Sequence, residues 1–205
     1  MNELKIGDLT AKVPIIQGGM GVGISLSGLA SAVANEGGIG VLATAGIGEQ
    51  ESDIFTNFIE ANNRGLRNEI RKAKSMTNGI IGVNIMVALS NYAELVKVAV
   101  EENIDIIFSG AGLPLNLPEY VANSKNHPKL VPIVSSGKGA ALLAKRWIEK
   151  FNYVPDAFVV EGPRAGGHLG FKKEQLFDEN FRLEILLKDV LEKIKPLEQI
   201  GRAHV

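Results

Sequence analysis

Residues 80–108, IIGVNIMVALSNYAELVKVAVEENIDIIF, decide the fold. Two short apolar runs, Ile80–Met86 and Ile104–Phe108, flank the helix-like stretch Tyr92–Glu102. The runs are rich in β-branched residues and contain few polar ones, as expected of strands that are buried on both faces. Parallel strands need a helical crossover between them. The stretch therefore predicts a βαβ unit within a parallel sheet.

The same alternation continues on both sides of this unit. Further strands are predicted at Val13–Gln17, Ile39–Ala43, Leu130–Val134 and Asp156–Glu161. Further helices are predicted at Leu26–Asn35, Ile54–Ala73 with a break near Gly65, Leu117–Ser124, Gly139–Lys150, and Phe181–Lys195 with its end before Pro196.

Successive strands start about 29 residues apart, a spacing that suits a (β/α)8 barrel, called a TIM barrel, which needs about 240 residues for eight units. The 205 residues hold about six units. We therefore expect an α/β protein with one domain over residues 1–199, a TIM barrel truncated at its C-terminal side.

Residues 200–205 depart from the amphipathic pattern that precedes them. One set of codons that could encode them matches the start of a widely used sequencing adapter. We expect a non-native tail here, and a short natural tail is the alternative.

Composition excludes several classes of function. The 22 basic and 23 acidic residues give a net charge of −1, so neither nucleic acid nor an anionic membrane surface is an expected partner. The chain has no cysteine, which removes disulfides, thiol nucleophiles and cysteine-liganded metals. The longest apolar stretch, Gly79–Leu89, is too short to cross a bilayer. We expect no metal site and a cytoplasmic location.

A glycine turn follows the first predicted strand, in Gln17-Gly18-Gly19-Met20. Ligands of α/β barrels lie at the carboxyl ends of strands, and glycine lets backbone amides approach them. The alternative is a tight turn without a ligand. The patterns typical of dinucleotide-binding Rossmann domains and P-loops do not occur.

Two later segments carry polar groups at strand ends. Asn84 interrupts an apolar strand, and its buried amide needs hydrogen-bond partners, from a flavin edge or from a neighbouring loop. Residues 159–170, VVEGPRAGGHLG, deliver His168 from a glycine loop after a strand. Because imidazole titrates near neutral pH, His168 is the candidate acid or base. Ser135 follows another strand and is an equally open candidate for ligand contact or turn formation.

These motifs resemble a known family. The segments PIIQGGMGVGIS, GVNIMVA, DIIFSGAGLP, PIVSSGKGA and VVEGPRAGGHLGF occur in order along the chain. They are similar to the nitronate monooxygenase (2-nitropropane dioxygenase-like) family of FMN-dependent TIM barrels.

The resemblance implies an FMN oxidoreductase that oxidises alkyl nitronates with dioxygen to a carbonyl compound and nitrite. His168 corresponds to the active-site histidine of the family, which holds a nitronate or removes the α-proton of a nitroalkane. The implied cofactor-binding residues are Gln17, Gly18, Gly19, Met20, Asn84, Ser135, Glu161, Ala165, Gly166 and Gly167.

Gly19 stands where many family members have proline, and it is shared with enoyl-acyl-carrier-protein reductase II. A flavin-dependent reductase that uses NAD(P)H is therefore the alternative enzyme. An inactive fragment is the alternative from another class, because two strands of the barrel are missing. The unpaired sheet edges of an incomplete barrel favour association into a homo-oligomer. A phosphate-sugar isomerase on the same barrel is a minor alternative.

Overall fold

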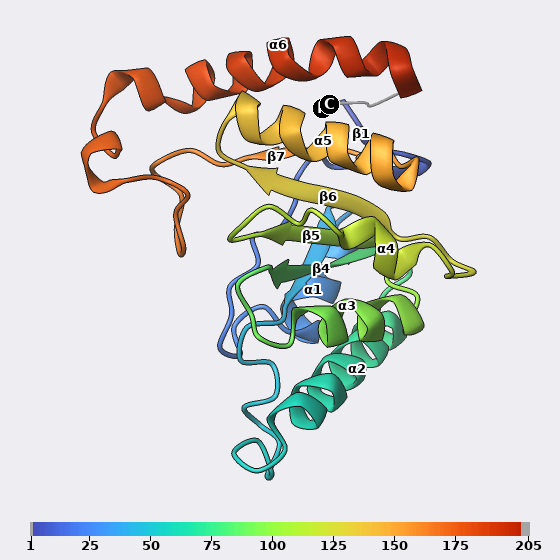
Figure 1. Ribbon diagram of the computed structural model, residues 1–205. Helices are drawn as coiled ribbons and strands as arrows, with labels where there is room; N and C mark the ends of the chain where they lie inside the picture. Colours follow the sequence, from blue (N-terminus) through green and yellow to red (C-terminus); the bar gives the residue numbers. More distant parts are fainter. Residues whose placement is uncertain (1, 202–205) are drawn as a thin grey trace.

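The computed structural model describes residues 2–201 (Figure 1). Its main feature is a five-stranded parallel sheet in which each strand pairs with the strand that follows it along the chain. The strands are β3 (Ile39–Ala43), β4 (Ile80–Met86), β5 (Ile106–Gly110), β6 (Lys129–Val134) and β7 (Val159–Val160). The helices are α1 (Ser27–Asn35), α2 (Phe58–Met76), α3 (Tyr92–Glu101), α4 (Leu117–Val121), α5 (Gly137–Phe151) and α6 (Leu183–Gly201).

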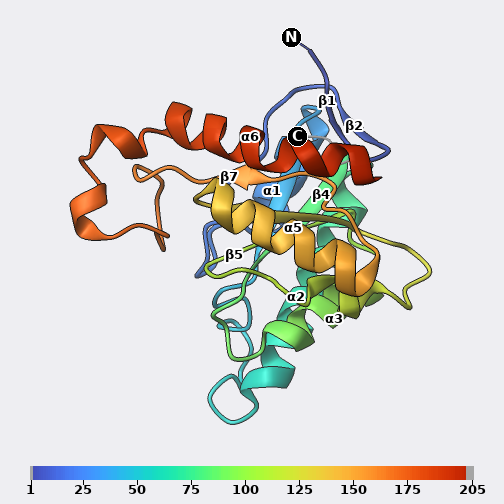
Figure 2. The same ribbon diagram turned by 45° about the horizontal axis from the view of Figure 1, so that its top comes forward.

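The sheet is an open part of a barrel. Its strand order never reverses, unlike that of a doubly wound sheet. In Figure 1 the βα units are stacked from α2 at the bottom to α6 at the top, and Figure 2 shows α6 lying across α5. The α/β partial-barrel prediction is confirmed. Of the expected tail, residues 202–205 lie outside the described residues, and residues 200 and 201 continue the backbone of α6.

Side chains alternate between two apolar layers, as the pleat of a strand requires. Leu42, Val83 and Ile107 belong to the layer between the sheet and its helices. Val41 and Phe108 face the barrel interior. Since Asn84 lies between the outward-facing Val83 and Ile85, its side chain also faces the interior, at the carboxyl end of β4.

A short hairpin that was not predicted covers the amino-terminal end of the interior. It consists of β1 (Leu4–Ile6) and β2 (Leu9–Ala11). Ile6 and Ala11 are 2% exposed and pack with the interior residues of β3, β5 and β6. The hairpin lies at the opposite end of the sheet from residues 161–182 (Figure 2). The interior is therefore covered at one end and accessible at the other.

The first predicted strand, Val13–Gln17, is reduced to a single parallel bridge between Ile16 and Ile39. Pro14 has no backbone N–H to extend a ladder, and two glycines follow Gln17. The segment still lies against β3, since the backbone of Gln17 donates to the Ile39 carbonyl at 3.0 Å. The β5 strand also starts later than expected, because the Asp105 side chain accepts from Ile81 N at 2.8 Å ahead of it.

Two helix expectations were wrong in detail. The helix α2 is continuous through Gly65, where a Cβ atom would lie 2.5 Å from the Ile47 carbonyl oxygen. This glycine permits close helix–loop contact and does not break the helix. The helix α6 continues past Pro196. Its stripe of Leu186, Val190 and Ile194, ahead of the proline, is buried.

Candidate functional site

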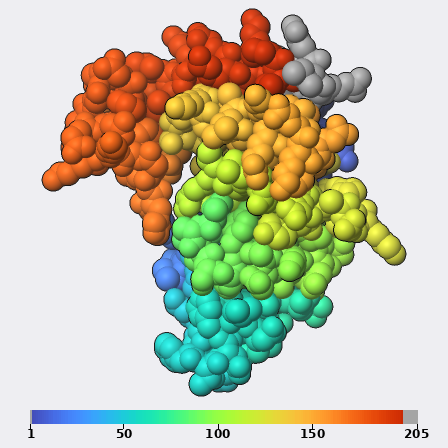
Figure 3. Space-filling model, in the orientation of Figure 1, coloured from blue at the N-terminus to red at the C-terminus, as the bar shows by residue number. Residues whose placement is uncertain are grey.

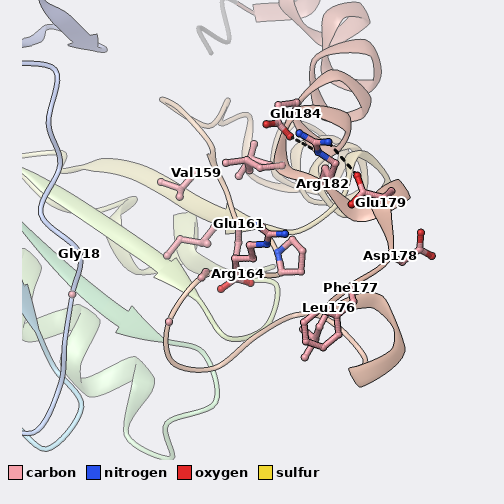
Figure 4. A pocket seen from close by; sticks show the side chains of 18 of the residues that line it. Gly18, Val159, Glu161, Arg164, Leu176, Phe177, Asp178, Glu179, Arg182 and Glu184 are labelled. Carbon is pink, nitrogen blue, oxygen red and sulfur yellow. Dashed lines mark hydrogen bonds and ion pairs between the residues drawn. The ribbon is translucent and has the colours of Figure 1, made fainter.

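A cavity of about 1060 Å³ opens at the carboxyl ends of β4, β6 and β7. This volume is slightly above the usual range for small-molecule sites, roughly 300–1,000 Å³. Figure 4 shows Gly18 on one side, Leu176, Phe177 and Asp178 on the other, and Glu161 and Arg164 between them. Strand ends, a glycine turn and two later loops thus surround one space.

The glycine turn is held by two polar side chains. The Gln17 amide donates to the Val41 carbonyl at 3.0 Å and accepts from Val41 N at 3.2 Å, so it acts as an extension of the sheet. The buried Ser25 hydroxyl donates to the Gly18 carbonyl at 3.2 Å and accepts from Met20 N at 3.0 Å. Sequence reasoning missed Ser25, although it lies within the same conspicuous motif. These bonds fix Gly18, Gly19 and Met20 at the cavity wall.

Asn84 lies in direct contact with this turn. A Cβ atom at Gly19 would be 2.5 Å from the Cβ of Asn84, a separation that real atoms do not adopt. The backbone carbonyl of Asn84 accepts from the N–H and the hydroxyl of Thr44 at 3.1 and 3.0 Å. Its carboxamide bonds to no residue that the structure describes, and it lines the cavity. The amide is therefore free to donate and accept toward a ligand.

The loop after β7 supplies the middle of the cavity wall. Glu161 N donates to the Val134 carbonyl at 2.8 Å, and the Glu161 carboxylate accepts from Gly170 N at 3.2 Å. These bonds close residues 161–170 into a loop whose members Glu161, Ala165 and Gly166 line the cavity. Gly167 has a φ of +81°, in the region that favours glycine.

Four of the predicted site residues do not line the cavity. They are Gln17, Ser135, Gly167 and His168. Gln17 is bonded to β3 as described, and Ser135 supports the loop, since a Cβ at Gly170 would lie 2.7 Å from its hydroxyl oxygen. His168 is exposed on the loop, two residues after the cavity-lining Gly166. The structure brings the other seven predicted residues together around one space.

None of the predicted site residues lies in the far wall of the cavity, residues 176–184. Arg182 forms ion pairs there with Glu179 at 3.1 Å and Glu184 at 3.5 Å. A hydrogen bond from the backbone of Glu184 and the positive charge of Arg182 lower the pKa of the Glu184 carboxyl. The segment has no regular apolar period, so only its two phenylalanines, at 177 and 181, signalled anything beyond a solvated loop.

The chain matches the profile of the family described as nitronate monooxygenase over residues 2–105 and again over residues 88–197. It belongs to this family. Among solved structures of similar fold, FabK from Thermotoga maritima is 28% identical with a TM-score of 0.65. Nitroalkane oxidase from Streptomyces ansochromogenes is 20% identical with a TM-score of 0.67, a likeness that concerns the fold alone.

This member of the nitronate monooxygenase family spans only part of its relatives. The matches cover 88% and 89% of the chain but 47% of FabK and 56% of nitroalkane oxidase. A Mycobacterium tuberculosis relative is described as (3aS,4S,5R,7aS)-5-hydroxy-7a-methyl-1-oxo-octahydro-1H-indene-4-carboxyl-CoA dehydrogenase. It is 29% identical over 158 residues, which are 77% of this chain and 38% of that protein.

Two kinds of feature are absent from residues 2–201. Within residues 2–201, no helix has the length and apolar character needed to cross a membrane. In the same part of the chain, no three acidic or histidine side chains gather in a way that would hold a metal ion.

Proposed function

We propose that this chain is the flavin-binding part of an FMN-dependent nitronate monooxygenase that oxidises alkyl nitronates with dioxygen. The observation that carries the proposal is the free Asn84 carboxamide, which lies against the glycine turn within the cavity. An isoalloxazine edge alternates carbonyl and N–H groups, and an amide can both donate to and accept from it. Family membership supports the same assignment.

The cavity residues suit such a ligand. Gly18, Gly19 and Met20, together with Asn84, would hold the ring, while Glu161, Ala165 and Gly166 would lie along the ribityl chain. Gly18 and Gly19 carry no side chain, so a flat ring can approach their backbone closely. When bound, FMN supplies an electron acceptor for the nitronate, and dioxygen completes the oxidation to a carbonyl compound and nitrite.

His168 is the proposed proton acceptor or nitronate-binding group. Because it lies outside the cavity lining, the loop must turn to bring it in. Neither Gly166 nor Gly167 has a neighbour within 4 Å of the position that a Cβ would take, so this part of the loop has room to move. An imidazole delivered in this way would remove the α-proton of a nitroalkane or bind nitronate oxygens.

The test of this proposal is flavin binding by absorption, followed by anaerobic addition of ethyl nitronate. We expect FMN to bind and to be bleached by the nitronate. Asn84→Ala should weaken FMN binding about tenfold, since each lost hydrogen bond contributes about 0.5–1.5 kcal/mol. Asn123→Ala, which changes an exposed asparagine, serves as the matched control. Absence of FMN binding would favour the inactive-fragment alternative.

A second candidate is a flavin-dependent enoyl-acyl-carrier-protein reductase that uses NAD(P)H. Gly19 favours it, because this position is glycine in that group and a larger residue would press on Asn84. The likeness to FabK at 28% identity supports it as well. Rapid reduction of the bound flavin by NADPH, without a nitronate, would distinguish the reductase from the monooxygenase.

A further inference from the structure

Residues 171–181 form a compact loop between the cavity and α6. Their ends meet, because the rings of Phe171 and Phe181 pack edge to face with centroids 6.2 Å apart. The loop contains two short 3-10 helices, η1 (Lys173–Gln175) and η2 (Glu179–Phe181). Figure 3 shows this part of the molecule, in orange, projecting from the body beside a hollow. The arrangement is that of an Ω-loop, whose ends are close and whose side chains pack on one another.

The polar bonds of the loop are local. Lys172 N donates to the Gln175 side chain at 2.7 Å, and Asn180 N donates to Asp178 at 2.9 Å. Arg182, just after the loop, pairs with Glu179. Within the described part of the chain, no hydrogen bond or ion pair joins residues 171–181 to a residue before 171 or after 182. None of the residues of η1 and η2 is buried.

The loop is therefore stable within itself but weakly attached to the body. Segments with few buried contacts open at low free energy. By contrast, the residue just before it is anchored, because Gly170 N bonds to the Glu161 carboxylate at 3.2 Å. After the loop, Leu186 is 6% exposed, so α6 is fixed within one turn of its start. Motion of the loop would be confined to these two joints.

Phe177 lies at the tip of the loop. Its side chain is 90% exposed and yet lines the cavity. Met20, 57% exposed, lines the cavity from the glycine turn. Apolar side chains on two walls of the cavity are thus exposed to solvent, and burial of such surface by a ligand or by the loop is favourable.

We propose that residues 171–181 are a lid that closes over the cavity as one unit and places Phe177 on the apolar part of the substrate. The inference rests on the proposed function, since the substrate is the nitronate bound beside the flavin. In the closed state Phe177 selects substrates that carry an alkyl chain. Closure buries Phe177 and excludes water from the cavity, and it requires no contact within the loop to break.

The absence of cysteine allows a direct test. Phe177→Cys and Phe55→Cys introduce single thiols at two phenylalanines of similar exposure, 90% and 98%, of which only Phe177 lines the cavity. The rate of alkylation by N-ethylmaleimide is measured in the free protein, with FMN, and with FMN and butyl nitronate without oxygen. We expect alkylation at position 177 to slow about tenfold with both ligands, which corresponds to a tenfold excess of the closed state. The rate at position 55 should not change.

Flavin absorption, read in the same samples, separates the two proposals. If FMN binds and the rate at position 177 stays constant, the lid is refuted and the proposed function stands. If FMN does not bind, the proposed function fails, and the lid is judged by trypsin cleavage after Lys172 and Lys173 in the free protein. Phe171→Ala should then raise cleavage several-fold, because the packed ends of the loop separate, while Phe177→Ala should not. Equal cleavage of Phe171→Ala and the unchanged chain would refute the lid.

Discussion

Gly19 and Gly18 are neighbours in the cavity wall, but they should respond in opposite ways to an added methyl group. A Cβ at Gly19 would lie 2.5 Å from the Cβ, 2.9 Å from the Cγ and 3.1 Å from the Nδ2 of Asn84. A Cβ at Gly18 would meet nothing within 4 Å. Neither glycine is among those with positive φ, so backbone strain does not separate the two substitutions.

The magnitude follows from this geometry. The backbone of Asn84 cannot shift easily, because it is paired on both sides, with Ala43 of β3 and Phe108 of β5. Overpacking of this kind costs about 1–3 kcal/mol. For a chain of this size, about 1 kcal/mol lowers the melting temperature by roughly 2–4 °C, so Gly19→Ala should melt roughly 2–12 °C lower. Gly18→Ala should melt within about 2 °C of the unchanged protein, since it adds a methyl group to open space.

Thermal unfolding of the three proteins by circular dichroism, without flavin, measures the difference. FMN titration then adds a second comparison. Gly19→Ala should also weaken FMN binding, because it moves the Asn84 amide. Ser25→Ala would instead remove the hydroxyl that bonds the Gly18 carbonyl and Met20 N. Equal melting temperatures for Gly18→Ala and Gly19→Ala would refute the argument that the turn is packed against Asn84.

Three further predictions concern a helix contact, acid stability and turnover. Gly65→Ala should lower the free energy of unfolding by about 1–3 kcal/mol despite the better helix propensity of alanine, because its Cβ would press on the Ile47 carbonyl; urea unfolding measures this, and a stabilised variant would contradict it. The pKa of Glu102 is lowered from 4.5, chiefly by its hydrogen bond with Arg71, so the pair stabilises the fold above that pH and the contribution disappears as the pH falls through the lowered value. Urea unfolding between pH 7 and pH 3 should show a smaller acid-dependent loss in Glu102→Gln than in the unchanged chain, and an identical loss would exclude this pair as a source. In a protein with a complete barrel, His168→Ala should reduce nitroalkane turnover roughly 10²- to 10⁴-fold if the imidazole transfers a proton, whereas unchanged turnover would remove it from that role.

The incomplete sheet also bears on how the chain associates. In the described residues, β7 pairs with β6 alone, whereas the β3 edge is covered by the Ile16–Ile39 bridge, the Gln17 amide and the Ser25 carbonyl. An unpaired edge such as that of β7 can template further pairing. The expected homo-oligomer stays a prediction, which sedimentation equilibrium measures directly.

Local sequence determined the strands that are buried on both faces. The bounds of β3 and β4 agree with prediction to the residue, because short, mostly apolar runs between turn signals leave little freedom in where a strand begins and ends. The same logic placed α1 and α3 within one residue at each end. It also identified Asn84 as a polar group that needs a partner, since an amide in an apolar strand is costly wherever the strand lies.

Tertiary structure alone decided which groups meet. The role of Gly65 depends on the Ile47 carbonyl, eighteen positions earlier in the chain, and the use of the Gln17 amide depends on Val41. The far wall of the cavity and the exposed position of His168 likewise have no local signature. Propensity and periodicity describe how a segment relates to a generic core or to water. They do not encode which distant backbone atom approaches it, and these approaches define the cavity.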